Sequence, residues 1–359
     1  MVATKLMMTS LILVQLWVLM PLMACGTTLD PMRERYEQWI SRYSRVYKDK
    51  NEKEWRFRIY ESNVQLINIF NTISEEYKLI DNKFADLTSE EFKAKSVCLR
   101  DLRNHRPSSL NFWTSMNCVS SGRISDMHEK KGSSVPSSID WREKGAVTLV
   151  RDQGECGSCW AFSTVAAVEG INKIKAGRLV ALSVQELVDC DTQGANSGCR
   201  GGFMTQAFDF ILRNHGLTSE SDYPYQGVEG ACETSKLSNH VATISGYKNV
   251  TPSSEQSLLK AVAAQPVSVA IDAGGFAFQF YSKGIFTGPC GSDLNHGVAV
   301  VGYGTAAAPT DQSNEFWIVK NSWGADWGEK GYIRMKRSIP DKRGLCGIAM
   351  KPSYPLKID

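Results

Sequence analysis

The apolar segment at the N-terminus constrains this chain most, because it decides the redox environment in which ten cysteines fold. The segment runs from Leu6 to Ala24, follows Lys5 and ends in small residues. This arrangement is typical of a secretory signal peptide, which we predict over residues 1–24. A membrane anchor is the alternative, but Pro21 and several polar residues interrupt the apolar run. The rest of the chain is therefore expected in an oxidising compartment, where cysteines form disulfides.

The balance of charges argues against a polyanionic partner. Lys and Arg number 41 and Asp and Glu 38, which gives a formal net charge of +3. So small an excess does not favour nucleic acid as a partner. With 42% hydrophobic and 22% charged residues, the composition is that of a globular chain and not of a disordered one. No later apolar run approaches the length of a membrane span, so we expect no membrane contact in the mature form.

Two regions are expected after the signal peptide. Residues 25–134 begin with a polar stretch, Met32–Ser74, in which aromatic and aliphatic residues recur at the spacing of amphipathic helices. The periodicity is absent from Cys98–Ser134, which is rich in polar residues and is interpreted as a linker or cleavage segment. In residues 135–359, Gly, Trp and Cys become frequent, which indicates a separate domain.

The domain at 135–359 divides into a helical half, about residues 145–245, and a strand-rich half, about residues 246–345. In the helical half, apolar residues at helical spacing before Gly177 predict a largely buried helix. Ser183, followed three residues later by a glutamate, predicts a capping box. The expected helices are Trp160–Lys175, a second that ends near Cys190, and Phe203–Leu212.

The strand-rich half contains β-type runs separated by glycines and short turns, which favours an antiparallel barrel and an α+β fold class. The predicted strands are Val241–Ile244, Val267–Ile271, Val298–Val301, Phe316–Val319 and Tyr332–Met335, with a short helix at about Ser254–Ala264. Asn249 begins a glycosylation sequon in a predicted loop, so it is a candidate glycan site.

Cys159 carries the first feature of a reactive site. It stands where the long helix begins, and there the unpaired N–H groups and the helix dipole favour a thiolate. A thiolate needs a proton acceptor, and His296 is the best placed histidine because it opens an apolar run, whereas His215 and His240 lie in more polar surroundings. Asn321 directly follows the fourth predicted strand and is a candidate for orienting the imidazole. Nucleophile, base and orienting residue would complete a catalytic triad.

The segments around these residues resemble those of papain-like cysteine proteases, in particular plant-type, cathepsin L-like members. The matching segments are Gln153–Phe162, Leu294–Gly297 and Asn321–Gly324. The resemblance covers residues 135–359 and much of the region before them. It implies an α+β, two-domain fold, one domain mainly helical and one an antiparallel β-barrel, with the active site in the cleft between them. It also implies an endopeptidase that needs no cofactor and no metal.

The resemblance implies a role for each site residue. Cys159 is the expected nucleophile, His296 the general base and then acid, and Asn321 the residue that orients the imidazole. Gln153 is the expected side-chain donor of the oxyanion hole, beside the backbone N–H of Cys159. The residues implied in substrate binding are Gly201, Gly202, Phe203, Met204, Ala270, Leu294, Gly297 and Lys351.

These binding residues predict how a substrate lies in the site. Gly201 and Gly202 carry no side chain, so an extended substrate backbone is expected to lie close to them. The pocket for the P2 residue, which is two positions before the cleaved bond, has apolar walls and is expected to prefer bulky hydrophobic side chains. Lys351, at the floor of this pocket, has two interpretations: a solvated side chain, which we favour, or a group that attracts an acidic side chain.

The cysteine count supports a reactive thiol. Residues 135–359 hold seven cysteines, an odd number, and Cys159 is the one assigned a reactive role. Sequence alone leaves 15 pairings open for the other six. The resemblance implies the pairs Cys156 with Cys199, Cys190 with Cys232, and Cys290 with Cys346. Cys98 and Cys118 precede this region, and no role is predicted for them.

Two other chemistries of cysteine are less favoured. Cys156-Gly157-Ser158-Cys159 has the spacing of a thioredoxin-type redox pair, but the strand-helix-strand context of such a pair is absent. A zinc site is less favoured still, because no second Cys-x-x-Cys and no paired histidines follow. The redox alternative predicts two titratable thiols at this segment, and the protease prediction has one.

The region before Val135 resembles the inhibitory propeptide of the same family. The residues that match its helical motif are Glu52, Arg56, Asn63, Ile67 and Asn71, with Tyr60 where Phe is usual. Asn82, Phe84 and Asp86 match the following motif, although Ile80 stands where Gly is usual. Residues 25–134 are thus expected to cover the cleft until they are cut near Val135, and acidification is the expected trigger if Asp86 and neighbouring carboxylates hold the contact.

The expected protein is therefore a zymogen of a cysteine endopeptidase. Its expected partners are peptide and protein substrates, its own propeptide and cystatin-type inhibitors, and it is expected to be a monomer. Residues 355–359 form no ER-retention signal, so the expected destination is extracellular or a lysosome or vacuole. A peptide-binding or storage relative without activity remains the alternative function, and exopeptidase activity stays open.

Overall fold

The computed structural model describes residues 30–96, 135–306 and 314–358. The chain divides into two compact units, Met1–Glu61 and Ser62–Asp359. The predicted signal peptide at 1–24 and the predicted linker Cys98–Ser134 lie outside the described residues.

The first unit contains helix α2, Pro31–Arg42, and the beginning of helix α3, Lys50–Ile73. The Asp30 carboxylate caps α2 by accepting a hydrogen bond from the Met32 N–H at 3.0 Å. An aromatic cluster joins the two helices, with the Tyr60 ring centroid 5.0 Å from that of Tyr36 and 5.3 Å from that of Trp39. These three rings are buried, which confirms the predicted amphipathic helices of this region.

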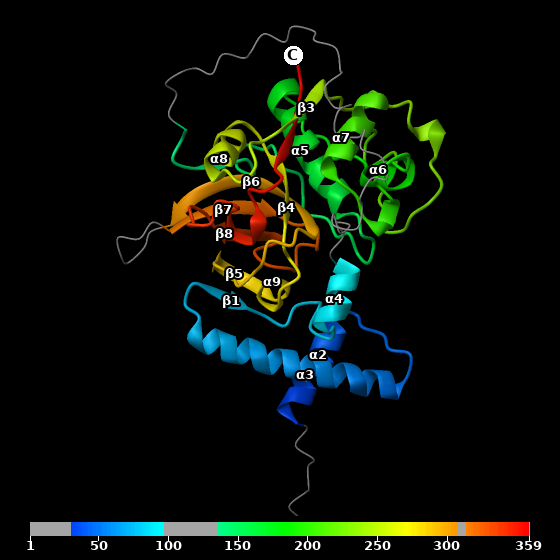
Figure 1. The fold of residues 1–359 in the computed structure, drawn as a ribbon. Helices are drawn as coiled ribbons and strands as arrows, with labels where there is room; N and C mark the ends of the chain where they lie inside the picture. Colours follow the sequence, from blue (N-terminus) through cyan, green and yellow to red (C-terminus); the bar gives the residue numbers. More distant parts are fainter. Residues whose placement is uncertain (1–29, 97–134, 307–313, 359) are drawn as a thin grey trace, which may run out of the picture. The chain divides into compact units, whose positions relative to one another are not determined.

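The second unit contains a group of helices and a large sheet. The helices of the group are α5, Cys159–Ala176; α6, Val184–Cys190; and α7, Met204–Arg213 (Figure 1). All three match the sequence predictions, and α5 ends at Gly177 with φ 71°. The predicted capping box is half formed, because Ser183 Oγ accepts from the Glu186 N–H at 2.9 Å while the Glu186 carboxylate binds Thr218 N instead.

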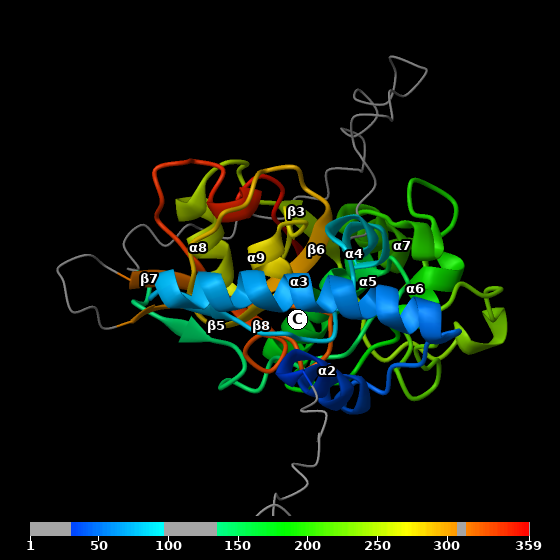
Figure 2. The ribbon, with the colours of Figure 1, turned by 90° about the horizontal axis from the view of Figure 1, so that it is seen from below.

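The sheet has nine strands, in the order β1-β5-β8-β7-β6-β4-β9-β3 with β2 paired to β6. They are β1 Tyr77–Leu79, β2 Ile139–Asp140, β3 Gly246–Asn249, β4 Val267–Ile271, β5 Tyr281–Phe286, β6 His296–Ala306, β7 Asn314–Lys320, β8 Tyr332–Lys336 and β9 Ser353–Leu356. Three further helices are α4 Ser89–Ser96, α8 Glu255–Ala264 and α9 Phe276–Gln279. Seen from below, α5, α6 and α7 lie on one side and β5, β7 and β8 on the other (Figure 2).

The predicted strands at 267–271, 298–301, 316–319 and 332–335 are confirmed as β4, β6, β7 and β8. The predicted strand Val241–Ile244 is wrong, because this segment forms only a single bridge, between Leu217 and Ala242. Asn249 is exposed, but it ends strand β3 and does not lie in a loop. The sheet is mostly antiparallel as expected, except that β5 and β8 run parallel.

Helix α5 joins the two halves of this unit. It contacts α6 and α7 as well as β4, β6 and β9, and most of its residues are buried. On the sheet side, Ala166 packs with Ala299, Val301 and Ile318. Close approach requires glycine at one point, since a Cβ atom on Gly170 would lie 2.5 Å from Cγ of Pro266. The position of the first residue of α5 is therefore fixed by packing along the whole helix.

Residues 62–96 pack against the sheet by main-chain and aromatic contacts. Strand β1 pairs antiparallel with β5, which extends the sheet by one strand. Asn82 Nδ2 donates to the carbonyl of Gln279 at 2.7 Å, and Gln279 Nε2 donates to the carbonyl of Phe84 at 3.3 Å. Helix α4, which the sequence analysis missed, begins with a capping box in which Glu91 N donates to Thr88 Oγ1 and Thr88 N donates to the Glu91 carboxylate. The pairing of β1 and the bonds to Gln279 hold the segment before α4 against the sheet.

Replacing Gly170 by Ala is expected to destabilise the chain. Alanine favours a helix by about 1 kcal/mol over glycine. The added methyl group would nevertheless overlap the rigid ring of Pro266, which costs about 1–3 kcal/mol in a packed core. We expect the thermal midpoint of the full chain to fall by about 2–6 °C.

Gly194→Ala is the matched control for this experiment. Gly194 is exposed, and its nearest neighbour would be the flexible side-chain end of Gln206 at 3.0 Å. We expect its thermal midpoint to stay within about 1 °C of the parent. An unchanged or higher midpoint for Gly170→Ala would show that Pro266 does not limit the approach of helix α5.

Candidate active site

Cys159 is fully buried and is the first residue of helix α5. Ser158 precedes it without a side-chain cap, so the positive end of the helix faces the sulfur. The Gly297 N–H donates to Cys159 Sγ at 3.0 Å, which places the sulfur beside the start of strand β6. Cys159 is disulfide-bonded in this structure. A thiolate at this position requires the free cysteine.

His296 and Asn321 come together because β6 and β7 are antiparallel. His296 begins β6 and Asn321 directly follows β7, so the start of one strand lies beside the end of the other. His296 Nε2 lies 2.8 Å from Asn321 Oδ1, and Ser322 N donates to the same oxygen at 2.8 Å. An oxygen only accepts, so His296 Nε2 carries the hydrogen. Nδ1 is buried and has no hydrogen-bond partner among the described residues, which leaves it as the basic nitrogen.

An aromatic cluster covers the imidazole. The Trp323 ring stacks on His296 with centroids 4.6 Å apart and an interplanar angle of 28°. Phe84 and Phe92 contact Trp323 edge-on, at 5.4 and 5.3 Å, and Trp327 lies 5.1 Å from it. Burial of the ring lowers the pKa of His296 to about 4, and the hydrogen bond to Asn321 opposes the shift only in part. The imidazole is therefore neutral in this covered form at pH values above about 4.

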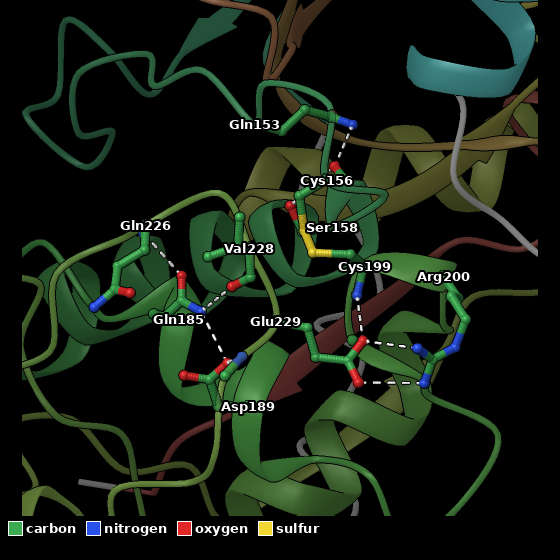
Figure 3. Close-up of a disulfide and its surroundings, with 12 residues drawn as sticks. Gln153, Cys156, Ser158, Gln185, Asp189, Cys199, Arg200, Gln226, Val228 and Glu229 are labelled. Carbon is green, nitrogen blue, oxygen red and sulfur yellow. Dashed lines mark hydrogen bonds and ion pairs between the residues drawn. A yellow bond between two sulfur atoms is a disulfide. The ribbon is translucent and has the colours of Figure 1, made fainter.

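Gln153 is fully buried next to these residues. Its Nε2 donates to the carbonyl of Cys156 at 3.1 Å (Figure 3), and its Oε1 accepts from Ser322 Oγ at 2.7 Å. The main-chain N–H of Gln153 donates to the carbonyl of Ser322 at 2.8 Å. Sequence analysis missed Ser322, although it lies within the Asn321–Gly324 segment, because its contact to Gln153 joins distant parts of the chain. Ser322 fixes which end of the amide faces the site.

The three implied disulfides of residues 135–359 are confirmed. Cys156 pairs with Cys199, Cys190 with Cys232, and Cys290 with Cys346. The first joins the turn before helix α5 to the glycine-containing segment that follows Cys199 (Figure 3). Beside it, the exposed Arg200 pairs with Glu229, which also accepts from the Cys199 N–H at 3.3 Å. The pairing also excludes Cys156 as half of a titratable redox pair with Cys159.

Gly201 and Gly202 lie on the segment behind this disulfide. Gly201 has φ 103°, which favours glycine. A Cβ atom on Gly202 would lie 2.4 Å from Asn196 Oδ1 and 2.8 Å from the Trp160 ring. Packing behind the segment thus requires glycine at 202, in addition to the expected approach of a substrate backbone.

The predicted P2 pocket residues lie at the junction of α7, β4 and β6. Met204 and Ala270 are buried in one apolar cluster, and Leu294 packs against it. Ala270 pairs with Gly297 across the sheet, and a Cβ on Gly297 would lie 3.3 Å from Met204 Sδ. Among the other substrate-binding candidates, Phe203 is half-buried and Lys351 is exposed. Of the two histidines that were less favoured as the base, His215 is exposed and His240 is half-buried.

Two ion pairs join the segment 83–96 to residues that lie on either side of Gln153 in the sequence. Lys83 Nζ pairs with the Asp152 carboxylate, and Lys95 Nζ lies 2.6 Å from Glu155 Oε1. Trp323 Nε1 donates to the carbonyl of Ser96 at 3.2 Å. The last described turn of α4 therefore lies against the tryptophan that covers the imidazole.

The described residues fall in the ranges 30–96, 135–306 and 314–358. No group of three or more His, Cys, Asp or Glu side chains in these ranges could hold a metal ion. No helix in the same ranges is long and apolar enough to cross a membrane.

Comparisons with known proteins agree with this geometry. Residues 135–356 match the model of the papain family cysteine proteases, and residues 36–92 match the cathepsin propeptide inhibitor domain. Vignain of Vigna mungo is 53% identical over 328 residues, 91% of this chain and 86% of that protein. The KDEL-tailed cysteine endopeptidase CEP2 of Arabidopsis thaliana is 49% identical over 344 residues, 93% of this chain and 91% of that protein.

Solved structures give the same assignment. A recombinant stem bromelain precursor has a TM-score of 0.78 at 42% identity and covers 92% of this chain and 100% of its own. The proform of the ragweed pollen cysteine protease Amb a 11 has a TM-score of 0.77 at 40% identity, covering 91% of this chain and 94% of its own. The chain therefore belongs to the papain family of cysteine proteases and is a cysteine endopeptidase that carries its own inhibitory propeptide domain.

Proposed function

We propose that Cys159 is the nucleophile of this endopeptidase, that His296 is its acid and base, and that Asn321 orients the imidazole. The observation that carries the proposal is the pair of contacts at His296. Nε2 is held by Asn321 Oδ1 at 2.8 Å, and the next residue, Gly297, donates its N–H to Cys159 Sγ at 3.0 Å. Nδ1 is then the nitrogen available to the thiol, and the helix dipole stabilises the resulting thiolate.

In the proposed reaction, the Cys159 thiolate attacks the carbonyl carbon of the cleaved peptide bond. The His296 imidazolium donates its proton to the leaving amine as the C–N bond breaks, which leaves a thioester on Cys159. His296 then takes a proton from water, which attacks the thioester and releases the acid product. Gln153 Nε2 and the Cys159 N–H are the donors for the oxyanion of each tetrahedral intermediate. Ser322 supports Gln153 by fixing its amide oxygen.

The substrate is an extended peptide whose main chain lies along Gly201 and Gly202. Its P2 side chain enters the apolar pocket formed by Met204, Ala270 and Leu294, so bulky hydrophobic P2 residues are preferred. The exposure of Lys351 supports the solvated interpretation of that side chain, since its charge reaches water.

The propeptide, proposed as residues 25–134, inhibits by covering the site. The support is the seating of α4 on Trp323 and the ion pairs on either side of Gln153. Cleavage near Val135 would release a mature domain, which we propose to be monomeric and open to cystatin-type inhibitors. The predicted signal at 1–24 and the exposed sequon at Asn249 support secretion or delivery to a lysosome or vacuole, with Asn249 glycosylated.

Acid releases the propeptide in this proposal, and His296 contributes to the effect. The covered ring has a pKa of about 4, whereas an uncovered histidine titrates near 6.5. Uncovering therefore takes up a proton between these pH values, so the covered form loses stability as pH falls through this window. Asp86 is buried in the same segment and remains a further candidate for the trigger.

The first prediction from the proposed function is that a peptidyl epoxide labels Cys159 once per molecule in acid-processed protein. The reaction should be run in a thiol reductant, because Cys159 is disulfide-bonded in this structure. Mass mapping should find the label on Cys159, and peptide hydrolysis should fall in proportion to labelling.

Cys159→Ala is the control for this titration and should neither be labelled nor hydrolyse peptide. Failure to label a folded, reduced and propeptide-free protein would refute the proposed catalytic roles. A label on another cysteine would refute the assignment of the nucleophile.

The second prediction concerns substrates that differ only at P2. Leu and Phe at P2 should give a kcat/KM at least about 10-fold above that of Glu, because an apolar pocket does not solvate a carboxylate. Lys351→Ala should leave this ratio within about 2-fold. If the Glu substrate is cleaved well by the parent and poorly by Lys351→Ala, Lys351 would instead bind the P2 carboxylate.

The third prediction concerns pH and is made in a full-length Cys159→Ala background. Hydrogen exchange of residues 84–96, corrected for its intrinsic pH dependence, should show protection that weakens by about 2 kcal/mol between pH 6.5 and 4.5. His296→Gln should remove most of this pH dependence, since glutamine does not titrate. His240→Gln is the matched control and should retain it; equal slopes in all three proteins would exclude His296 as a trigger.

A further inference from the structure

The segment Gly201–Phe203 is held from behind by one buried side chain. Asn196 Oδ1 accepts a hydrogen bond from the Phe203 N–H at 2.6 Å, and Asn196 Nδ2 donates to the Phe203 carbonyl at 3.4 Å. The amide thus pairs with both main-chain groups of one residue, as a neighbouring strand would. Asn196 is buried, so water does not replace these contacts easily.

Asp191 fixes the orientation of this amide. Asn196 Nδ2 donates to Asp191 Oδ2 at 2.5 Å, and a carboxylate only accepts, so the amide nitrogen must face Asp191. Asp191 is itself buried at the end of helix α6, with Arg213 at 3.9 Å as its charged neighbour. The orientation set at α6 leaves Asn196 Oδ1 directed at the Phe203 N–H.

The space behind the segment is full. A Cβ on Gly202 would overlap both Asn196 Oδ1 and the Trp160 ring, so the segment already lies as close to them as glycine allows. The Ser197 N–H donates to the carbonyl of Gly201 at 3.0 Å, which holds the preceding peptide group. Among the residues that the structure describes, the Gly202 main chain makes no hydrogen bond, so it is available to an added strand.

We propose that Asn196, oriented by Asp191, is a positioning residue. It holds the main chain of the segment Gly201–Phe203 in the position at which an extended peptide main chain binds to it. Asn196 does not touch the reacting atoms. It acts on the binding of the peptide main chain and not on the reactivity of Cys159. The inference rests on the proposed function, because it takes this segment as the substrate-binding edge.

The test compares two reagents for Cys159 on acid-processed, reduced enzyme. A peptidyl epoxide needs the binding edge, whereas iodoacetamide needs only the reactive thiol. Asn196→Ala should slow inactivation by the epoxide about 5- to 10-fold, the effect of about one lost hydrogen bond. Its reaction with iodoacetamide should stay within about 2-fold of the parent, and KM for a peptide should rise more than kcat falls.

A swapped pair keeps the test informative if Asn196→Ala does not fold. Asn196→Asp retains an acceptor for the Phe203 N–H but sets two carboxylates side by side, so it should slow the epoxide reaction. Adding Asp191→Asn restores a donor and an acceptor between the two positions, so the double variant should recover most of the rate. Asn172→Ala is the matched control, since Asn172 is buried in α5 and its side-chain Nδ2 donates to the Arg178 carbonyl at 2.9 Å.

The outcomes separate the two proposals. If both reagents slow equally in Asn196→Ala, or the epoxide rate is unchanged, or the swapped pair is not rescued, the positioning role is refuted. If Asn172→Ala produces the same selective loss, the effect is one of general stability and the role is likewise refuted. If the parent enzyme fails to react with the epoxide while it reacts with iodoacetamide, the proposed function falls, and the inference with it.

Discussion

Helix α5 is buried between α6 and α7 on one side and the sheet on the other, and the geometry of the site depends on this packing. Its residues pack against both halves, so the helix cannot shift toward one without losing contact with the other. Gly170 allows the close approach to Pro266 that this position needs. The first residue of the helix, Cys159, is therefore held rigidly, and the unpaired N–H groups of the first turn face the site. The proposed nucleophile is thus positioned by a buried helix and not by a loop.

The antiparallel register of β6 and β7 supplies the second half of the site. It brings the start of β6, where His296 lies, next to the end of β7, which Asn321 follows. Trp323, two residues beyond Asn321, stacks on the imidazole and excludes water. Exclusion of water strengthens the hydrogen bond to Asn321, but it also penalises the charged ring. The low pKa of His296 in the covered form follows from this, and it couples the protonation state of the proposed catalytic base to the presence of the propeptide.

Sequence patterns predicted what depends on local periodicity. Helix α5 and strands β4, β6, β7 and β8 have clear apolar patterns and were found, and the resemblance to the family supplied the disulfide pairs. Strand β5 was missed because Gly284 interrupts it; that glycine is needed where Tyr77 of β1 crosses closely. Strand β9 was missed because it contains Pro355, which argues against a strand. The apolar run at 241–244 was predicted as a strand but forms a single bridge. Ser322 and Asn196 were missed because their roles come from side-chain hydrogen bonds that carry no periodic signal.

The contacts of segment 62–96 also show which forces hold the propeptide. Its ion pairs, Lys83 with Asp152 and Lys95 with Glu155, have at least one largely exposed partner, and such pairs contribute about 0–1 kcal/mol each. Burying a phenylalanine side chain contributes about 1.5–3 kcal/mol, and Phe84 and Phe92 are both buried against Trp323. The propeptide is thus held mainly by apolar contact and by the pairing of β1 with β5. Apolar contacts do not titrate, so the proposed acid trigger needs titratable groups in the covered site, and the imidazole beneath Trp323 is one such group.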